Sequence, residues 1–356
     1  MKKIWLYILC STVFLALDAI PSDINAKVLK FQESGEFVWC GDKYLAISRH
    51  SRGADAGIRL LDVDHGHARQ LTTTKTHRVV ACTADGKHIF YVENGVDGSM
   101  YELDIENGSQ NSIYTKNTFQ HRAIEEYPIS SSGDTLIGPT TLNDRIALSD
   151  RYVNVLHIPE AFSSSNVEGI TWSKNGTLFL IVGAGFGEHM NTQQTLLIRK
   201  TGELNFKTVN LPSIKNARFR QIGWSEATNR LYMLAWSDGA RLYEFDPNGP
   251  KRLRHLLARN VTELKAMPNG GLVYIQDEGA DYSAPDSVAI SDTSHRLLLM
   301  RTPQGELMEL LKVPYKSIGI SNIQISPSGM DVAVQVKKID GLNNMMEIHV
   351  LKHIAK

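Results

Sequence analysis

Short runs in which hydrophobic and polar residues alternate recur along the whole chain, and each run follows a tight turn rich in Gly, Asp, Asn or Ser. CTADGKHIFYV from Cys82 and ISPSGMDVAV from Ile325 are two clear copies. Alternation of this kind predicts β-strands, and the turn residues predict hairpins between them. The residues that open the seven turns are spaced 42, 47, 43, 52, 42 and 59 residues apart: Gly41, Thr83, Ser130, Ser173, Ser225, Met267 and Ser326.

This spacing is close to the period of a four-stranded propeller blade. We therefore expect an all-β fold, a seven-bladed β-propeller of four-stranded antiparallel blades. The last copy lacks a fourth strand after residues 346–351, and an open blade would expose unpaired backbone groups. Because residues 27–32 alternate suitably, we expect this first mature strand to close the ring. Residues 27–356 are then one propeller domain.

The order of strands within a copy follows from the same pattern. In the second copy we expect strands over residues 78–82, 88–92 and 100–104. The third copy, ISSSGDTLIG from Ile129, is followed by the least regular pattern. Trp172 and Trp224 hold equivalent positions just before their turns, and we expect both rings to be wedged between neighbouring blades.

The N-terminus resembles an export signal. Lys2 and Lys3 precede an apolar stretch over residues 4–17, which is short for a membrane span, and Ala26 offers a cleavage site. We expect residues 1–26 to be a signal peptide and the mature chain to be periplasmic or secreted, without stable membrane insertion. An uncleaved membrane anchor is the alternative.

The charge balance argues against nucleic-acid binding. The chain has 38 Lys and Arg residues and 38 Asp and Glu residues, so its net charge is zero, and it contains no long basic run. A protein that follows a phosphate backbone needs a clustered basic surface. We therefore expect no nucleic-acid partner, and we expect the protein to be a monomer.

Export would allow Cys40 and Cys82 to pair, because the compartment is oxidising. Both cysteines lie immediately before the turn of successive copies, at a position that is apolar in every copy. We therefore expect two packed thiols on neighbouring blades, at a separation beyond disulfide reach.

Several blocks carry a resemblance to a known family. ISPSGMDVAV, CTADGKHIFYV, ARLYEFDPNG and SMYELDIENG are similar to the repeats of TolB-type, WD40-like propellers. The resemblance extends over residues 36–353 and implies the propeller fold. The α/β domain that precedes the propeller of TolB itself has no room in this chain. Repeats of this type occur in translocation accessories, peptidase gating domains and lyases, so the resemblance implies no single function.

The sequence contains no specific catalytic or metal-binding motif. Residues 62–67, DVDHGH, offer oxygen and imidazole groups, but they lie where every copy has a Gly turn, and we expect a solvated hairpin without metal. No Gly-x-Ser-x-Gly elbow occurs. The sequence therefore leaves catalytic residues and any cofactor unassigned.

Loop lengths indicate a candidate binding face. The first-to-second strand turns are tight, whereas the second-to-third strand loops and blade connectors, which share the other face, are long: residues 48–57, 138–151, 183–195 and 276–295. Function on propellers usually resides on loops that a rigid ring supports. The candidate binding residues on this face are Arg49, Arg52, Glu188, His189, Arg220, Trp236, Asp277, Glu278, Asp281 and Tyr282.

Two function classes remain open at this stage. The first is an exported, non-catalytic propeller that binds a protein or cell-envelope component through the long-loop face. The second is a propeller-type enzyme, such as a lyase, lactonase or quinoprotein, with a polar site at the channel mouth. Neutral charge and the lack of a recognisable catalytic constellation favour the first.

Overall fold

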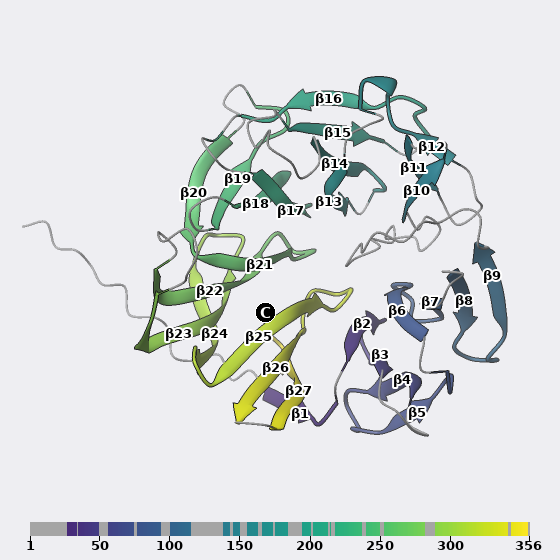
Figure 1. Ribbon diagram of the computed structural model, residues 1–356, viewed down its shortest axis with the longest axis vertical. Coiled ribbons are helices and arrows are strands. Elements are labelled where there is room, and N and C mark those ends of the chain that lie inside the picture. The colour runs from purple at the N-terminus through teal and green to yellow at the C-terminus, as the bar shows by residue number, and fades with distance from the viewer. Residues whose placement is uncertain are drawn as a thin grey trace, which may run out of the picture.

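The computed structural model describes residues 27–33, 35–49, 56–74, 77–93, 100–114, 138–142, 145–149, 155–162, 166–173, 175–183, 194–200, 202–212, 214, 218–236, 240–249, 253–281, 289–340 and 343–354. These residues form antiparallel sheets arranged in a ring around a central axis (Figure 1). The expected signal peptide, residues 1–26, lies outside the described residues.

Six sheets have four strands each, and we number them as blades in chain order. The first blade contains β2 (Glu36–Cys40), β3 (Tyr44–Arg49), β4 (Gly57–Asp62) and β5 (Ala68–Gln70). The second contains β6 (His77–Cys82), β7 (His88–Glu93), β8 (Met100–Asp104) and β9 (Gln110–Tyr114). The third contains β13 (Asn166–Trp172), β14 (Leu178–Gly183), β15 (Thr195–Arg199) and β16 (Lys207–Asn210).

The other three blades complete the four-stranded set. The fourth contains β17 (Arg218–Ser225), β18 (Arg230–Trp236), β19 (Arg241–Phe245) and β20 (Leu253–Arg259). The fifth contains β21 (Val261–Ala266), β22 (Leu272–Asp281), β23 (Ala289–Arg301) and β24 (Leu307–Pro314). The sixth contains β25 (Ile318–Ile325), β26 (Val332–Asp340), β27 (Asn343–Lys352) and β1 (Lys27–Phe31).

The prediction of seven four-stranded blades is wrong. Between the second and third blades the described residues form only a three-stranded sheet, of β10 (Gly138–Leu142), β11 (Arg145–Ser149) and β12 (Val155–His157), followed by a short 3-10 helix η1 (Glu160–Phe162). Its strands have 5, 5 and 3 residues, and Pro139 has no amide hydrogen to donate to a ladder. The region that was expected to be a loop over residues 138–151 is therefore largely the β10–β11 hairpin.

The N-terminal strand closes the ring, as the sequence predicts. β1 pairs antiparallel with β27, and the register runs from Lys27 opposite Lys352 to Phe31 opposite Ile348. Leu29 and Phe31 pack on a core cluster that the sixth blade shares with the first. β1 therefore covers the outer edge of the last blade and contributes to its core.

The recurring turns explain why Ser or Thr so often opens them. In the second blade, the Thr83 hydroxyl accepts a hydrogen bond from the amide of His88 at 3.0 Å. In the sixth blade, the Ser326 hydroxyl accepts one from the amide of Asp331 at 3.1 Å. A short hydroxyl side chain thus satisfies amide groups that the turn leaves unpaired. The Gly in the turn of the second blade also has a packing role. Gly86 has φ +71°, and a Cβ there would lie 3.0 Å from the carbonyl oxygen of Cys40.

This close approach of neighbouring turns corrects the prediction for the cysteines. Cys40 at the end of β2 and Cys82 at the end of β6 form a disulfide, with their Cα atoms 5.2 Å apart. Because Gly86 lacks a side chain, the turn of the second blade rests directly on Cys40 and Gly41 of the first. The two inner strands therefore come within disulfide reach.

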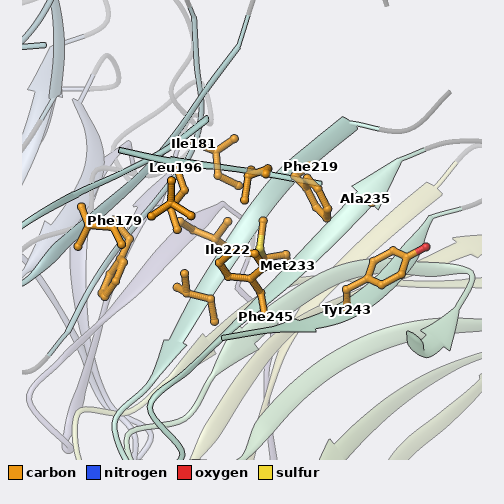
Figure 2. Packing of buried hydrophobic residues seen from close by; sticks show 13 residues of the cluster. Phe179, Ile181, Leu196, Phe219, Ile222, Met233, Ala235, Tyr243 and Phe245 are labelled. Atoms are coloured by element: carbon orange, nitrogen blue, oxygen red, sulfur yellow. The ribbon is translucent and has the colours of Figure 1, made fainter. Parts of the chain in front are cut away.

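Blades pack against each other through hydrophobic side chains from facing sheets. Figure 2 shows the cluster between the third and fourth blades, in which the labelled residues are Phe179, Ile181, Leu196, Phe219, Ile222, Met233, Ala235, Tyr243 and Phe245. Trp224 of β17 stacks on Phe179 of β14, with ring centroids 4.6 Å apart. Its ring therefore lies between two blades as predicted, although it is only partly buried. Trp172 is also partly buried and packs on a cluster that contains Ile158 and Leu178.

Polar side chains add directional contacts between blades. The Gln221 side-chain oxygen of β17 accepts a hydrogen bond from the amide of Leu264 in β21 at 3.2 Å. The Glu263 carboxylate of β21 accepts hydrogen bonds from the amides of Asn322 and Ile323 in β25 at 2.8 and 2.6 Å. Inner strands carry β-bulges, and the bulge in β25 frees the amides of Asn322 and Ile323 from the ladder. Side chains of the preceding blade bind those amides, so hydrogen bonds also hold neighbouring blades in register.

Candidate functional site

The ring has two faces that differ in construction. We call the face that carries the tight first-to-second strand turns and the third-to-fourth strand turns the turn face. We call the opposite face, from which the second-to-third strand segments emerge, the loop face. It carries the ends of β3 and β18, and the β22–β23 hairpin, which the structure extends as paired strands to Asp281 opposite Ala289. The expected long loop over residues 276–295 is therefore mostly a hairpin, which corrects that prediction.

The fourth blade brings Arg220 and Trp236 together on the loop face. Trp236 ends β18, and Arg218 in β17 lies opposite it. A register shift between Phe219 and Gln221 takes Arg220 out of the regular ladder. The Arg220 guanidinium lies over the Trp236 ring, 5.7 Å from its centroid. Trp236 remains 37% exposed although most large apolar side chains of this blade are buried. A guanidinium over an exposed indole is a suitable contact for a polar or carboxylate-bearing ligand.

Arg218 beside this pair is buried in a polar network between the third and fourth blades. Its guanidinium forms a close ion pair with Glu168 of β13. Gln194 donates to the Phe219 carbonyl at 2.8 Å and accepts from the Phe219 amide at 2.7 Å. Burial lowers the pKa of Arg218, and the positive charge of Arg220 lowers it further. The network fixes the strand that presents Arg220.

Two predicted binding residues of the fifth blade, Asp277 and Glu278, pair with basic side chains of the same blade. Asp277 is 1% exposed, and the guanidinium of Arg296 binds both of its oxygens, at 2.6 and 3.1 Å. Arg296 also lies over the Tyr315 ring, 4.5 Å from its centroid. Glu278 is more exposed and pairs with Lys312 at 3.0 Å. Asp277 thus has a structural partner inside its own blade, and Glu278 remains accessible on the surface.

Arg49 on the first blade lies in a separate ion-pair cluster. The Arg49 Nε and Glu33 Oε2 atoms are 3.1 Å apart, and the Arg59 guanidinium binds the other Glu33 oxygen at 2.9 Å. Glu33 is buried. Arg49 therefore pairs with a residue of the connector between β1 and β2, and Asp277 pairs within the fifth blade. Arg52, Glu188, His189 and Tyr282 lie outside the described residues, as does the side chain of Asp281.

The turn at residues 62–67 is a hairpin, as expected. The Asp62 carboxylate accepts hydrogen bonds from the amides of Asp64 and His65 at 3.0 and 3.1 Å. Burial raises the pKa of Asp62, but hydrogen bonds from His65 and Lys43 outweigh it and lower the pKa to about 2. Within the described ranges, no three His, Cys, Asp or Glu side chains are grouped as metal ligands. No helix in the described part of the chain is long and apolar enough to cross a bilayer.

Several charged residues of the fourth blade were missed by sequence reasoning. Arg241 lies opposite Ala235, and Arg259 lies opposite Arg241, in the row next to Trp236. The sequence held a signal for them. Residues 218–260 contain eight Lys and Arg but only four Asp and Glu, whereas the whole chain is neutral. A charge count for each blade would have found this asymmetry.

Comparisons with known proteins support the fold. No family model matches the sequence, and no curated protein matches it. The structure is similar to the β-propeller domain of the Trilobed protease from Pyrococcus furiosus, which has an open velcro topology. The TM-score is 0.58 with 12% identity, over 90% of this chain and 95% of that chain. The present ring differs in that β1 pairs with β27.

Two further similar structures are a chain of an assembly and a β-propeller domain. A chain of the Mitotic Checkpoint Complex has a TM-score of 0.55 and 14% identity, over 98% of this chain and 99% of that chain. The Cps50 (Swd1) β-propeller domain of Myceliophteria thermophila has a TM-score of 0.55 and 11% identity, over 92% and 98% of the two chains. At these identities the similarity establishes the propeller fold and nothing finer.

Proposed function

We propose that this protein is a non-catalytic, TolB-like propeller that binds a protein or cell-envelope partner through its loop face. The observation that carries the proposal is the pairing of Arg220 with the half-exposed Trp236 on a rigid strand end. Aromatic and Arg side chains are the residues that most often dominate protein interfaces. The neighbouring Glu168, Arg218 and Gln194 contacts hold this strand end in place, so a partner meets a preorganised surface.

We also propose that the chain is exported, with residues 1–26 as its signal peptide, and acts as a monomer in the periplasm or outside the cell. The Cys40–Cys82 disulfide supports this location, because structural disulfides persist in oxidising compartments. The similar structures include a protease propeller domain and a chain of an assembly, so the fold is compatible with binding but does not select it.

The test compares capture by two double variants. Trp236→Ala/Arg220→Gln removes the loop-face pair. Leu204→Ala/Lys87→Gln is the matched control, because it removes one apolar and one basic group from the turn face, where the Leu204 residue is 89% exposed and the Lys87 side chain 71% exposed. Wild-type protein and both variants are immobilised and incubated with envelope extract of the source cells.

We expect the wild type and the control to retain one common partner that the loop-face variant loses. With the purified partner, the dissociation constant should rise about thirty-fold or more, since loss of an interface hot spot costs about 2 kcal/mol or more. Equal retention by the loop-face variant and the wild type would contradict the proposal.

A further inference from the structure

Charged residues lie at both ends of the fourth blade. At the turn face, the Arg230 guanidinium pairs with Glu244 at 3.2 Å and also contacts Asp246. Glu244 of β19 and Asp246 of the turn after it therefore both pair with Arg230 at that end. The loop-face end of the same blade carries arginines, of which Arg218 pairs with Glu168 of the preceding blade.

Four arginines gather at the loop-face end. Arg218 lies in the row of Trp236, and Arg220 is displaced by the bulge beside it. Arg241 and Arg259 lie opposite each other in the next row, on β19 and β20. Arg220 and Arg259 are exposed and Arg241 is half-buried. Arg218 is buried against Glu168, so we call Arg220, Arg241 and Arg259, with the exposed Trp236, the arginine edge.

We propose that the arginine edge binds an acidic segment of a protein partner, with carboxylates on the guanidinium groups and an apolar side chain on Trp236. This inference rests on the proposed function and names the partner's chemistry. Guanidinium groups bind carboxylates in a bidentate manner, and Arg is less strongly hydrated than Lys, so such pairs suit an interface. Arg220, Arg241 and Arg259 place three positive charges at this end of the blade, which gives the edge a local complement for acidic chains.

The dimensions of the edge favour a peptide over a longer polyanion. Four neighbouring strands at a spacing of about 4.8 Å span about 14 Å. That is the length of a peptide segment of about four extended residues. Nucleic acids and sulfated polysaccharides bind through a series of phosphate or sulfate contacts along an extended basic path. Arg220, Arg241 and Arg259 come from three strands of one blade, and the exposed Trp236 at the end of the remaining strand, β18, suits an apolar side chain.

The test uses defined probes and charge-matched variants. The first probe is a short fluorescent peptide of Glu residues with one central Phe. The second replaces every Glu by Gln, and the third is a heparin oligosaccharide. Arg241→Gln/Arg259→Gln removes two charges from the edge without touching Arg220 or Trp236. Lys87→Gln/Lys207→Gln removes two exposed charges from the turn-face side. Arg241→Lys/Arg259→Lys keeps the charge but loses the forked geometry, and melting curves verify that each variant is folded.

We expect the Glu peptide to bind and the Gln peptide not to bind. The Arg→Gln variant should weaken Glu-peptide binding about tenfold or more, the Arg→Lys variant by less, and the Lys→Gln control hardly at all. Failure of the Glu peptide to bind, or equal binding by the Arg→Gln variant, would overturn the inference. Heparin binding without peptide binding would also overturn it, because the site would then select polyanions.

The two proposals can fail separately. If the captured partner depends on Trp236 and Arg220 but is bound equally by the Arg241→Gln/Arg259→Gln variant, the acidic-segment inference is wrong and the loop-face proposal stands. If neither variant affects capture, both are wrong.

Discussion

The carboxylate of Asp42 accepts a hydrogen bond from the backbone amide of Ser328 at 2.8 Å, although 286 residues separate the two. Asp42 belongs to the first tight turn and Ser328 to the last. The Trp39 indole also donates to the Gln324 carbonyl at 3.2 Å. Two kinds of contact therefore close the ring between the first and sixth blades: side-chain hydrogen bonds near the turn face, and the pairing of β1 with β27.

Closure by β1 should contribute measurably to stability. Phe31 packs on the cluster shared by the first and sixth blades, so Phe31→Ala should lower the free energy of unfolding by about 2 kcal/mol. Val28 on the same strand is 40% exposed, and Val28→Ala should change it by less than about 0.5 kcal/mol. Urea unfolding of the two variants checks this. Equal urea midpoints for the two variants would mean that the Phe31 side chain of β1 does not contribute to the hydrophobic core.

The Cys40–Cys82 disulfide should stabilise the native ring. Its cysteines are separated by 42 residues, and closing a loop of that size in the unfolded chain stabilises the folded state by about 2–4 kcal/mol. Reduction should lower the melting temperature of the wild type and leave a Cys40→Ala/Cys82→Ala variant unaffected. Peptide mapping without reductant should recover the linked pair. Recovery of both cysteines as free thiols from protein purified from the envelope would refute the bridge.

Asp277 should prove structural. Its carboxylate is buried against Arg296, and Asp277→Asn leaves a partly buried guanidinium without its counter-charge, at a cost of about 3 kcal/mol. Glu278→Gln changes an exposed pair and should cost about 0.5 kcal/mol. Thermal unfolding distinguishes the two. If Asp277→Asn is as stable as the wild type, the ion pair does not support the hairpin, and Asp277 returns to the set of candidate ligands.

Stability should fall in mild acid. His349 is buried, and its Nε2–H donates a hydrogen bond to the Glu347 carboxylate at 2.8 Å. Burial lowers the pKa of His349; Glu347 partly opposes this, and the charges of Lys30 and Lys338 lower the pKa further. The folded state therefore holds His349 neutral, while the unfolded chain takes up a proton below about pH 6.5.

The urea midpoint of the wild type should thus be level above about pH 7 and decline as the pH falls through 6.5. His349→Gln should show a shallower decline. The remaining slope comes in part from His77, whose pKa is also lowered by burial. An identical decline in the variant would show that His349 does not contribute.

Much of the fold could be predicted from the sequence because its strongest signals are local. The Ser and Thr that open the turns bind amides within the same turn, as Thr83 and Ser326 do, so their chemistry is visible in a few neighbouring residues. The closing strand could be predicted because an unpaired edge requires a partner. The sequence predicts four strands around the turn of the third copy, but the described residues form only the three strands β10–β12. A turn at the right spacing does not guarantee four strands around it.

The features that sequence reasoning missed depend on contacts between strands. The polar segment around Asp277 looks like a loop, yet Arg296 lies directly opposite and neutralises it within a hairpin. The disulfide depends on how closely two turns approach, which the absence of a side chain at Gly86 decides. Arg220 and Trp236 were named from their loop positions, but their ring contact arises from a bulge that no local pattern shows.

The most direct test of the loop-face account is a photocrosslinking comparison in the source cells. A benzophenone amino acid replaces Trp236 on the loop face or, in a second strain, Leu204 on the turn face, which is the more exposed of the two. The account predicts that light links a partner to position 236 and that Arg220→Gln in the same chain reduces the adduct, while position 204 gives none. A partner adduct from position 204 alone, or equally from both positions, would contradict it.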